Sequence, residues 1–338
     1  MSKQITAEIS IKNLLYNVKQ VKKLIGKSKF CAVIKADAYG HGLTEFANAL
    51  YPNVDAYAVS LESECVKLRQ AGIDKEIILL TPVFTDNVER LILNKITLSV
   101  STEEELKLIY RYAKKLGRVV KIHFALNTGM NRLGFSSESE VLNAVNYVKK
   151  HKNNLFLTGA FSHLGNAKNV KYANCQRKQF ELLVRLIKEY NVNATLHLAS
   201  SGGVLLGEKF LYDMVRVGIM LYGYTPYKTK KITLKKTATI LAPILLSRDN
   251  VFNKRVMYGD KKCKTNSISV ARIGYADGIR REKTYGVIGN ACMDVSAVKK
   301  VNGNNFIISD LSLLSKKYHT ITYETLVSVL KRAERIYK

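Results

Sequence analysis

The chain has 338 residues, and its 54 lysines and arginines against 27 aspartates and glutamates give a formal net charge of +27. This length allows about two domains with sizeable cores, so folding needs neither disulfides nor a metal. With 47% hydrophobic residues and only 4 prolines, the composition excludes a collagen-like, low-complexity or largely disordered chain. The basic excess is the unusual feature, and nucleic-acid binding is the first hypothesis that it raises.

The basic residues are distributed along the chain rather than concentrated in one segment. Pairs such as Lys22-Lys23 and Lys114-Lys115 lie at the ends of helical patterns, where they favour solvation and the helix dipole. The sequence contains no long basic block, zinc finger or aromatic RNA-binding signature. We therefore expect most of the charge to be solvated surface, and we expect no nucleic-acid partner.

Several sequence features together predict a cytoplasmic protein without disulfides or a metal site. The first ten residues lack an apolar signal core, and no apolar run approaches the roughly 18–20 residues of a membrane span. The five scattered cysteines form no C-x-x-C pair, which favours reduced thiols in a cytoplasmic protein over disulfides or zinc. No H-E-x-x-H spacing is present, so we expect no metal. His123 and His197 are interpreted as buried strand histidines rather than catalysts.

In chain order, a helix is predicted over Ile11–Ile25 with Ser10 as its N-cap. Short apolar runs then alternate with amphipathic helical segments such as Thr102–Leu116, Ser137–Lys150 and Gln176–Tyr190. The predicted strands are Phe30–Ile34, Ala56–Val59, Ile77–Leu80, Thr97–Val100, Val119–Leu126, Phe156–Phe161, Ala194–Ala199 and Met214–Val217.

Eight strands that alternate with helices predict a (β/α)8 barrel of the TIM type. A doubly wound open sheet is the alternative, but it would usually carry a G-x-G-x-x-G or P-loop motif after its first strand, and neither is present. We therefore predict an α/β barrel over residues 1–225 and a mostly β domain over residues 226–338. The second domain is predicted from short strand-like segments at 237–246, 255–258, 267–275, 285–288, 291–298 and 306–309, followed by a helix over Tyr323–Ala333.

Polar residues follow three of the predicted barrel strands, where a barrel forms its site. Lys35 ends the first strand, and burial in a barrel mouth would lower the pKa of its amine and suit it to Schiff-base chemistry. A surface lysine is the alternative interpretation. The last two strands are followed by Ser200–Gly203 and by Gly218-Ile219, whose hydroxyls and backbone N–H groups could bind phosphate. A lysine and a phosphate cradle together suggest pyridoxal phosphate as cofactor.

Five motifs follow one another along nearly the whole chain. They are AVIKADAYGHG at 32–42, TGMNRLG at 128–134, VRVGIMLYG at 215–223, GYADG at 274–278 and CMD at 292–294. In sequence and in order they resemble the motifs of the alanine racemases, which are barrel enzymes dependent on pyridoxal phosphate. The resemblance implies an isomerase that interconverts L-alanine and D-alanine, supplies D-alanine for peptidoglycan, and works as a homodimer with shared active sites.

The resemblance also implies roles for individual residues. Lys35 would hold the cofactor covalently and act as one catalytic base, and Tyr275 would act as the opposite base in the partner subunit's site. The other residues implied are Tyr39, Ser201, Gly218 and Ile219 for the phosphate, Arg216 for the pyridine nitrogen, His163 for orienting the tyrosine–arginine network, Arg132 for the cofactor oxygen and the substrate carboxylate, and Met293 and Asp294 for the partner's substrate.

The chemistry of racemisation explains this set. A proton must leave one face of the α-carbon and return on the other, which requires two bases with pKa values tuned down from about 10. We expect burial to do this for Lys35 and neighbouring cations to do it for Tyr275. Arg216 keeps its proton and so leaves the pyridine nitrogen unprotonated, which favours a racemase over a related decarboxylase. A racemase of serine or lysine, a decarboxylase, and a cofactor- or nucleic-acid-binding regulator without turnover remain the alternatives.

The sequence departs from the family pattern at several positions. Ala125 stands where many members have a carbamylated lysine, so we expect Asn127 to help orient Arg132. Lys331 aligns with the family's phosphate-binding tyrosine, so a point charge would replace a hydroxyl. Only 18 positions separate residues 275 and 293, which is shorter than the family pattern and predicts a trimmed substrate entrance.

Overall fold

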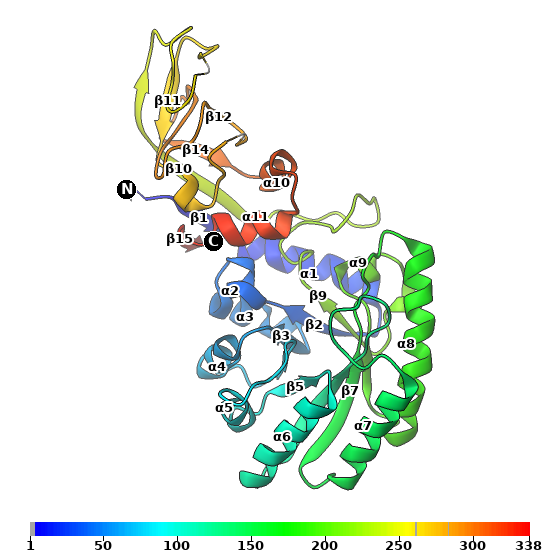
Figure 1. Ribbon diagram of the computed structural model, residues 1–338. Coiled ribbons are helices and arrows are strands. Elements are labelled where there is room, and N and C mark those ends of the chain that lie inside the picture. Colours follow the sequence, from blue (N-terminus) through cyan, green and yellow to red (C-terminus); the bar gives the residue numbers. More distant parts are fainter. Residues whose placement is uncertain (1–3, 261, 283) are drawn as a thin grey trace.

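The computed structural model describes residues 4–260, 262–282 and 284–338. Eight parallel strands form the first sheet: β2 (Lys29–Val33), β3 (Ala56–Val59), β4 (Glu76–Leu79), β5 (Thr97–Val100), β6 (Val120–Ala125), β7 (Leu155–Phe161), β8 (Thr195–His197) and β9 (Met214–Val217). Neighbours in sequence are neighbours in the sheet, and β9 pairs with β2. The Ala199 carbonyl, just after β8, accepts the Arg216 N–H of β9 at 2.9 Å, and this bond closes the barrel (Figure 1). The predicted barrel is confirmed, and its strand ends differ from the prediction by no more than two residues.

Helices cover the outside of the barrel because their apolar faces pack on strands that are buried on both sides. The predicted cap Ser10 accepts a backbone N–H at 3.2 Å, and Thr102 and Ser137 cap their helices in the same way, also at 3.2 Å. The helices are α1 (Ile11–Ile25), α3 (Leu43–Leu50), α4 (Glu62–Gln70), α5 (Val88–Leu93), α6 (Glu103–Lys115), α7 (Glu138–Lys150) and α8 (Val170–Tyr190), with the short elements α2 (Lys35–Tyr39), η1 (Tyr51–Asn53), α9 (Ser201–Val204) and η2 (Glu208–Phe210).

The second sheet contains seven strands and includes both ends of the chain. β1 lies antiparallel to β10 and parallel to β15, so the first strand pairs in this sheet although it falls inside the segment predicted as barrel. The predicted boundary between residues 225 and 226 stays a prediction. The elements are β1 (Thr6–Ile9), β10 (Ala238–Arg248), β11 (Ile268–Ala271), η3 (Tyr275–Asp277), β12 (Val287–Ile288), β13 (Ser296–Lys299), β14 (Asn305–Ile308), α10 (Ser312–Tyr318), α11 (Thr322–Val329) and β15 (Glu334–Tyr337).

The sequence analysis was least accurate in this domain. It omitted β1, β15 and α10, and it predicted a strand over residues 255–258 where the described structure has only isolated bridges. These elements are four to seven residues long, and the two strands are ordered by partners far away in the sequence, such as Thr6 and Glu334. Periodicity over so short a segment does not distinguish a strand from a loop.

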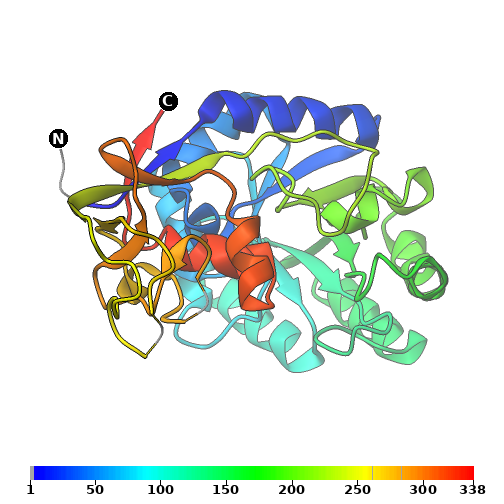
Figure 2. The ribbon, with the colours of Figure 1, turned by 90° about the horizontal axis from the view of Figure 1, so that it is seen from above.

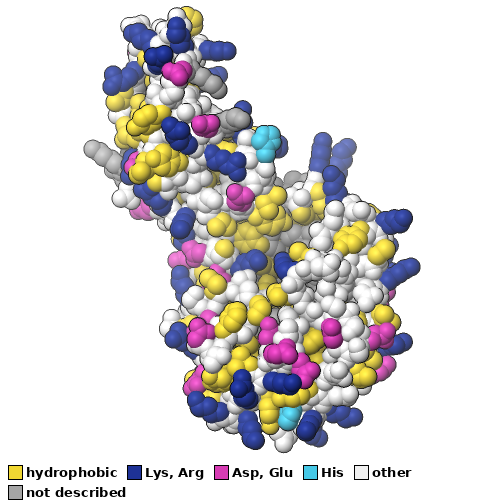
Figure 3. Space-filling model, viewed as in Figure 1, with side chains coloured by type: hydrophobic (Ala, Val, Ile, Leu, Met, Phe, Trp, Pro, Cys, Tyr) yellow, Lys and Arg dark blue, Asp and Glu magenta, His cyan; other side chains and the backbone are white. Residues whose placement is uncertain are grey.

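The second domain lies at one side of the barrel mouth, with α11 between its sheet and α2 (Figures 1 and 2). On the face seen in Figure 3, lysine and arginine side chains are scattered and mixed with acidic ones rather than gathered in one band. Within the described residues, no helix has the length and apolar character needed to cross a membrane.

Asn17 of α1 joins the barrel to the segment that leads into the second domain. Its side-chain amide donates to the carbonyls of Leu221 at 3.0 Å and Lys235 at 2.7 Å, and its oxygen accepts the Lys235 N–H at 2.8 Å. The side chain is fully buried, so water cannot replace these bonds.

We expect Asn17→Ala to lower the free energy of unfolding by about 3 kcal/mol, because it leaves buried backbone groups without partners. Urea unfolding followed by circular dichroism would measure the change. Asn143→Ala on the exposed face of α7 is the matched control, and we expect it to stay within about 0.5 kcal/mol of the wild type. Equal losses in both variants would contradict the structural role of Asn17.

Candidate active site

A cavity of about 360 Å³ lies at the carboxyl ends of the barrel strands. All of the barrel residues to which the sequence assigns a role line it, together with Ser200 of the predicted phosphate-binding segment and seven further residues. The predicted lining residues are Lys35, Tyr39, Arg132, His163, Ser201, Arg216, Gly218 and Ile219, and the others are Val33, Ser60, Leu80, Thr81, Leu133, Phe161, Ser200 and Tyr323.

The remaining predicted residues, Tyr275, Met293 and Asp294, lie in the second domain and do not line this cavity. Tyr275 is 40% exposed and Met293 is 55% exposed. Within one chain the structure therefore does not bring the two predicted bases together. Their distance from the cavity of their own chain is what the predicted sharing between subunits requires.

Lys35 stands at the entry to an unusual turn. The four residues that follow it, Ala36 to Tyr39, all have φ between 52° and 54°, which is the left-handed region. None of them is glycine, and each costs about 1–2 kcal/mol in this conformation. The turn directs both Lys35 and Tyr39 into the cavity, although only six residues, 34–39, separate β2 from Gly40.

Contacts with three other parts of the chain hold this turn. Glu64 of α4 is buried, and one of its oxygens accepts the Asp37 N–H at 3.2 Å. Asp37 accepts the Leu43 N–H at 2.9 Å and forms an ion pair with Arg335 of β15 at 2.6 Å. Strain of this kind persists only where the surroundings over-determine the conformation, as they do here.

The electrostatics of the cavity make the Lys35 amine easier to deprotonate. Burial and, secondly, the charge of Arg132 lower the pKa of Lys35, and Glu64 opposes this only in part. This is the direction predicted from the position of the lysine at a strand end. A lower pKa leaves more of the amine in the neutral, nucleophilic form near neutral pH.

Arg216 is 4% exposed and is anchored from behind by β8. It donates to the carbonyls of Ser162 at 2.6 Å and His197 at 2.7 Å, and also to the His197 ring at Nδ1 at 2.9 Å. Burial lowers its pKa to about 10, so Arg216 still carries its charge at neutral pH.

Two histidines continue the network behind Arg216. Because His197 accepts at Nδ1, its proton is assigned to Nε2, which faces Nδ1 of His123 at 3.0 Å. Burial and the charge of Arg216 keep the pKa of His197 far below its usual range, and burial lowers that of His123 to about 4. His197 is a buried strand histidine, as the sequence analysis predicted. It also orients the predicted site residue Arg216, and the sequence analysis did not predict this role.

His163 is the histidine that faces the cavity. Burial lowers its pKa to about 3, and the charges of Arg216, Arg132 and Lys35 act in the same direction. The ring is therefore neutral at physiological pH. The cations that line the cavity are then available to bind an anionic ligand. No described acidic side chain lines the cavity.

A small-anion cradle lies at the ends of β8 and β9. The Gly218 N–H donates to Ser201 Oγ at 3.2 Å, and both groups border the cavity. A β-carbon at Gly218 would lie 2.7 Å from the Tyr39 hydroxyl, so a side chain here would displace the Tyr39 ring. Hydroxyl groups and a backbone N–H that converge at one end of a cationic cavity fit a phosphate group.

Arg132 reaches the cavity from the loop after β6. Asn127 organises this loop by accepting the N–H groups of Gly129 at 3.1 Å and Asn131 at 2.9 Å. We expected Asn127 to help orient Arg132. It does so by fixing the backbone of the loop, because its hydrogen bonds are to loop residues and not to the Arg132 guanidinium.

Tyr323 of α11 lines the cavity and was not predicted from the sequence. Its ring centroid lies 5.9 Å from that of Tyr39, and burial raises its pKa to about 12, so it keeps its proton. Lys331, proposed from the alignment as a phosphate contact, is exposed and is not a lining residue. A tyrosine on a short amphipathic helix carries no local signal of this role, because only the packing of α11 against α2 brings it there.

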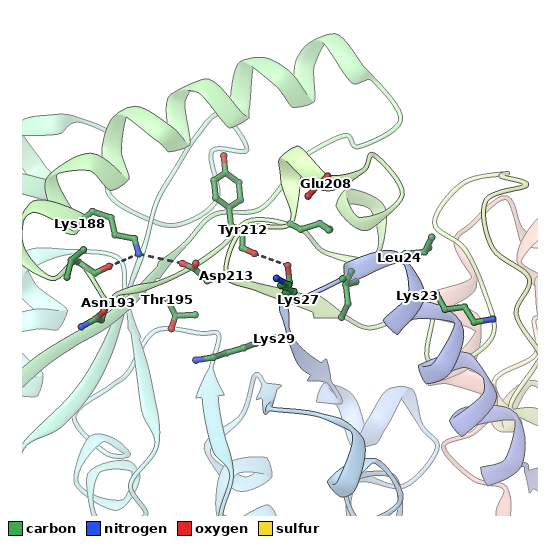
Figure 4. A pocket seen from close by; sticks show the side chains of 15 residues that line it. Lys23, Leu24, Lys27, Lys29, Lys188, Asn193, Thr195, Glu208, Tyr212 and Asp213 are labelled. Atoms are coloured by element: carbon green, nitrogen blue, oxygen red, sulfur yellow. Dashed lines mark hydrogen bonds and ion pairs between the residues drawn. The ribbon is translucent and has the colours of Figure 1, made fainter.

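A larger cavity, of about 1090 Å³, lies at the opposite end of the barrel and contains none of the predicted site residues (Figure 4). Lys29 opens β2 there, and Lys188 bonds the Val192 carbonyl at 2.8 Å and approaches Asp213 at 3.7 Å. Barrels place their chemistry at the carboxyl ends of the strands, so the smaller cavity is the candidate site.

Fold and site together define a β/α barrel whose mouth combines a lysine of lowered pKa with a cationic anion-binding cradle. Residues 9–226 match the family model of the alanine racemase N-terminal domain. Alanine racemases of Clostridium novyi and Treponema denticola are 30% and 32% identical to this chain, each over 98% of it and over 94% and 97% of their own lengths. The solved alanine racemase of Clostridium difficile 630 is 30% identical with a TM-score of 0.91, over 99% of this chain and 96% of that one.

The chain belongs to the alanine racemase family. The resemblance found in its five motifs is thereby confirmed. The alignment with the Clostridium novyi protein runs over 370 positions, which exceeds the 338 residues of this chain. This chain therefore lacks segments that the relative has, and residues 275–293 are where its sequence predicts such a loss.

We expect the Lys35 amine to titrate at a lower pH than an ordinary surface lysine. The protein would first be treated with hydroxylamine to remove cofactor bound to the lysine. Acylation with a small reagent between about pH 6 and pH 11, followed by mass spectrometry, would then give the titration midpoints of Lys35 and of a reference lysine. Lys107, whose pKa is raised by its hydrogen bond to Glu103, is the internal control. Arg132→Gln should move the Lys35 midpoint upward, and a Lys35 midpoint at or above that of Lys107 would contradict the electrostatic argument.

Proposed function

We propose that this protein is an isomerase that interconverts L-alanine and D-alanine with pyridoxal phosphate as cofactor. The observation that carries the proposal is the joint presence in one cavity of Lys35, with its lowered pKa, and the charged, fully anchored Arg216. The relatives at about 30% identity over nearly the full length are alanine racemases, which supports the same activity here.

The residues of the cavity fit the cofactor. Tyr39, Ser201, Gly218 and Ile219 border the cradle that would receive the phosphate, and Gly218 leaves room there that a side chain would fill. Arg216 would face the pyridine nitrogen, and Lys35 would supply the amine that bonds the cofactor. When bound, pyridoxal phosphate supplies an electron-withdrawing ring that makes the α-carbon proton of an amino acid acidic.

This chain's residues would then move the proton. Lys35 Nζ, whose lowered pKa favours the neutral amine, takes the α-proton on one face of the substrate or returns it there. Arg132 holds the substrate carboxylate, which fixes the α-carbon between the two bases. Arg216 donates hydrogen bonds and keeps its own proton, so it limits how far the ring withdraws electrons and disfavours loss of carbon dioxide.

The second base, Tyr275, would come from the partner subunit of a homodimer. Its partial exposure, with that of Met293 beside it, leaves both free to enter another subunit's cavity. We also propose that the enzyme works in the cytoplasm and supplies D-alanine for peptidoglycan synthesis. Racemases of serine or lysine and a decarboxylase of the same fold are the alternatives to be tested.

The deciding experiment incubates the purified enzyme with single L-amino acids and measures both D-product and carbon dioxide. We expect D-alanine from L-alanine, and L-alanine from D-alanine, with no carbon dioxide. Carbon dioxide without D-product would refute the racemase. Lys35→Ala should abolish the visible absorbance of the lysine-bound cofactor and the activity together, and a persistent visible band would refute the role of Lys35.

Tyr275→Phe removes the acid–base hydroxyl of the second base and keeps the ring. We expect kcat to fall by about 100-fold or more in both directions, because general acid–base catalysis contributes roughly that much. The visible absorbance of the bound cofactor should remain, since the residues proposed to hold the cofactor, such as Lys35, Ser201 and Arg216, are unchanged. Unchanged rates with both enantiomers would exclude the two-base scheme.

A further inference from the structure

Arg332 lies just beyond α11 and contacts two carboxylates at once. Its guanidinium is 3.5 Å from Asp277 Oδ1 and 3.2 Å from Asp294 Oδ1. Asp277 comes two residues after Tyr275, and Asp294 comes directly after Met293. One side chain therefore bridges both segments that the proposed function assigns to the partner's active site.

The backbones of the two segments are already joined beneath Arg332. The Tyr275 N–H donates to the Cys292 carbonyl at 3.0 Å, and the Ala276 N–H donates to the Met293 carbonyl at 3.0 Å. Asp277 Oδ2 accepts the Gly274 N–H at 2.9 Å and so closes the η3 turn that carries Tyr275. Tyr275 and Met293 thus belong to one structural unit.

The other oxygen of Asp277 makes this unit depend on Arg332. Asp277 is 1% exposed, and its Oδ1 is buried and accepts no hydrogen bond from any described residue. Within the described chain, the ion pair of this carboxylate is with Arg332. A buried charge that loses its partner is strongly unfavourable, so removal of Arg332 would disturb the Tyr275 turn itself.

The neighbouring Arg272 cannot replace this bridge. It lies 3.9 Å from Asp294 Oδ1 and donates to the Asp294 carbonyl at 3.5 Å, and its recorded contacts do not include Asp277. Arg272 therefore supports one segment, whereas Arg332 ties that segment to the Tyr275 turn.

Arg332 is also placed by the helix that borders this chain's own cavity. Tyr323 near the start of α11 lines that cavity. Near the end of α11, the Ser328 carbonyl is so close to Gly278 that a side chain there would collide with it. The same helix thus contacts the cavity proposed for the cofactor in its own chain and the tyrosine turn proposed for the partner's site.

We propose that Arg332 is a positioning residue that fixes Tyr275, together with the Met293–Asp294 segment, for the partner subunit's active site. This inference rests on the proposed function, because it needs Tyr275 to act as a base across the dimer. It concerns the orientation of that base and not the binding of the cofactor.

We expect Arg332→Gln to lower kcat by about 10- to 100-fold, the loss that follows from a misplaced catalytic group. The rise in KM for alanine should be smaller than the fall in kcat, and the visible absorbance of the bound cofactor should change little. Arg332→Lys should recover part of the loss, since it keeps the charge but not the fork that reaches two carboxylates. The control is Arg185→Gln, which removes an arginine that likewise lies near two carboxylates, Glu138 at 3.4 Å and Glu189 at 3.9 Å, on the outside of the barrel.

A double-mutant cycle tests whether Arg332 acts through Tyr275. In a Tyr275→Phe background, Arg332→Gln should cost less than about 3-fold, because the group that it positions is already gone. Fully additive losses would overturn the proposal. Wild-type enzyme without racemase activity would instead refute the proposed function, so the two failures are distinguishable.

Mixed dimers locate the effect on one subunit. A Lys35→Ala chain paired with a Tyr275→Phe chain should form one competent site, in which the Lys35→Ala chain supplies Tyr275. Arg332→Gln placed on the Lys35→Ala chain should reduce this activity by the same 10- to 100-fold, and placed on the Tyr275→Phe chain it should leave the activity intact. Equal losses in both arrangements would indicate a general folding defect and overturn the proposal.

Discussion

The left-handed turn after Lys35 is the constraint on which the rest of the site depends. Four successive residues without glycine cannot hold this conformation by themselves, because each is sterically unfavourable. The turn persists because Glu64 from α4 and Arg335 from β15 bind its backbone and its Asp37 side chain. The barrel and the carboxyl-terminal strand must therefore both be in place before Lys35 and Tyr39 face the same cavity.

The positions of a few basic side chains matter more for the site than the net charge of the molecule. A net charge of +27 suggested a polyanionic partner, yet the basic side chains on the visible face are dispersed among acidic ones. In the cavity, Lys35, Arg132 and Arg216 converge, no acidic residue of the described chain lines it, and the neighbouring histidines are neutral because of burial. This arrangement leaves the positive charge available to an anionic cofactor and a carboxylate substrate.

Helix α11 connects the cavity of the barrel with the Tyr275 turn of the second domain. Through Tyr323 it completes the wall of the cofactor cavity, and at its end it supports the turn that carries Tyr275. Because one short element contacts both, the spacing between the cavity and the Tyr275 turn is set within a single chain. In the dimer that we propose, association would then only have to bring two such preformed halves together.

The sequence by itself determined the barrel, its strand limits, the helix caps and the barrel residues of the cavity, because these depend on local periodicity, capping chemistry and an ordered set of motifs. Only the tertiary structure placed Tyr323 in the cavity, assigned His197 to Arg216 and brought Arg332 against Asp277. It also paired β1 with β10 and β15. These contacts join residues far apart in the chain, where no local pattern reports the partner, so their chemistry became visible only when packing brought them together.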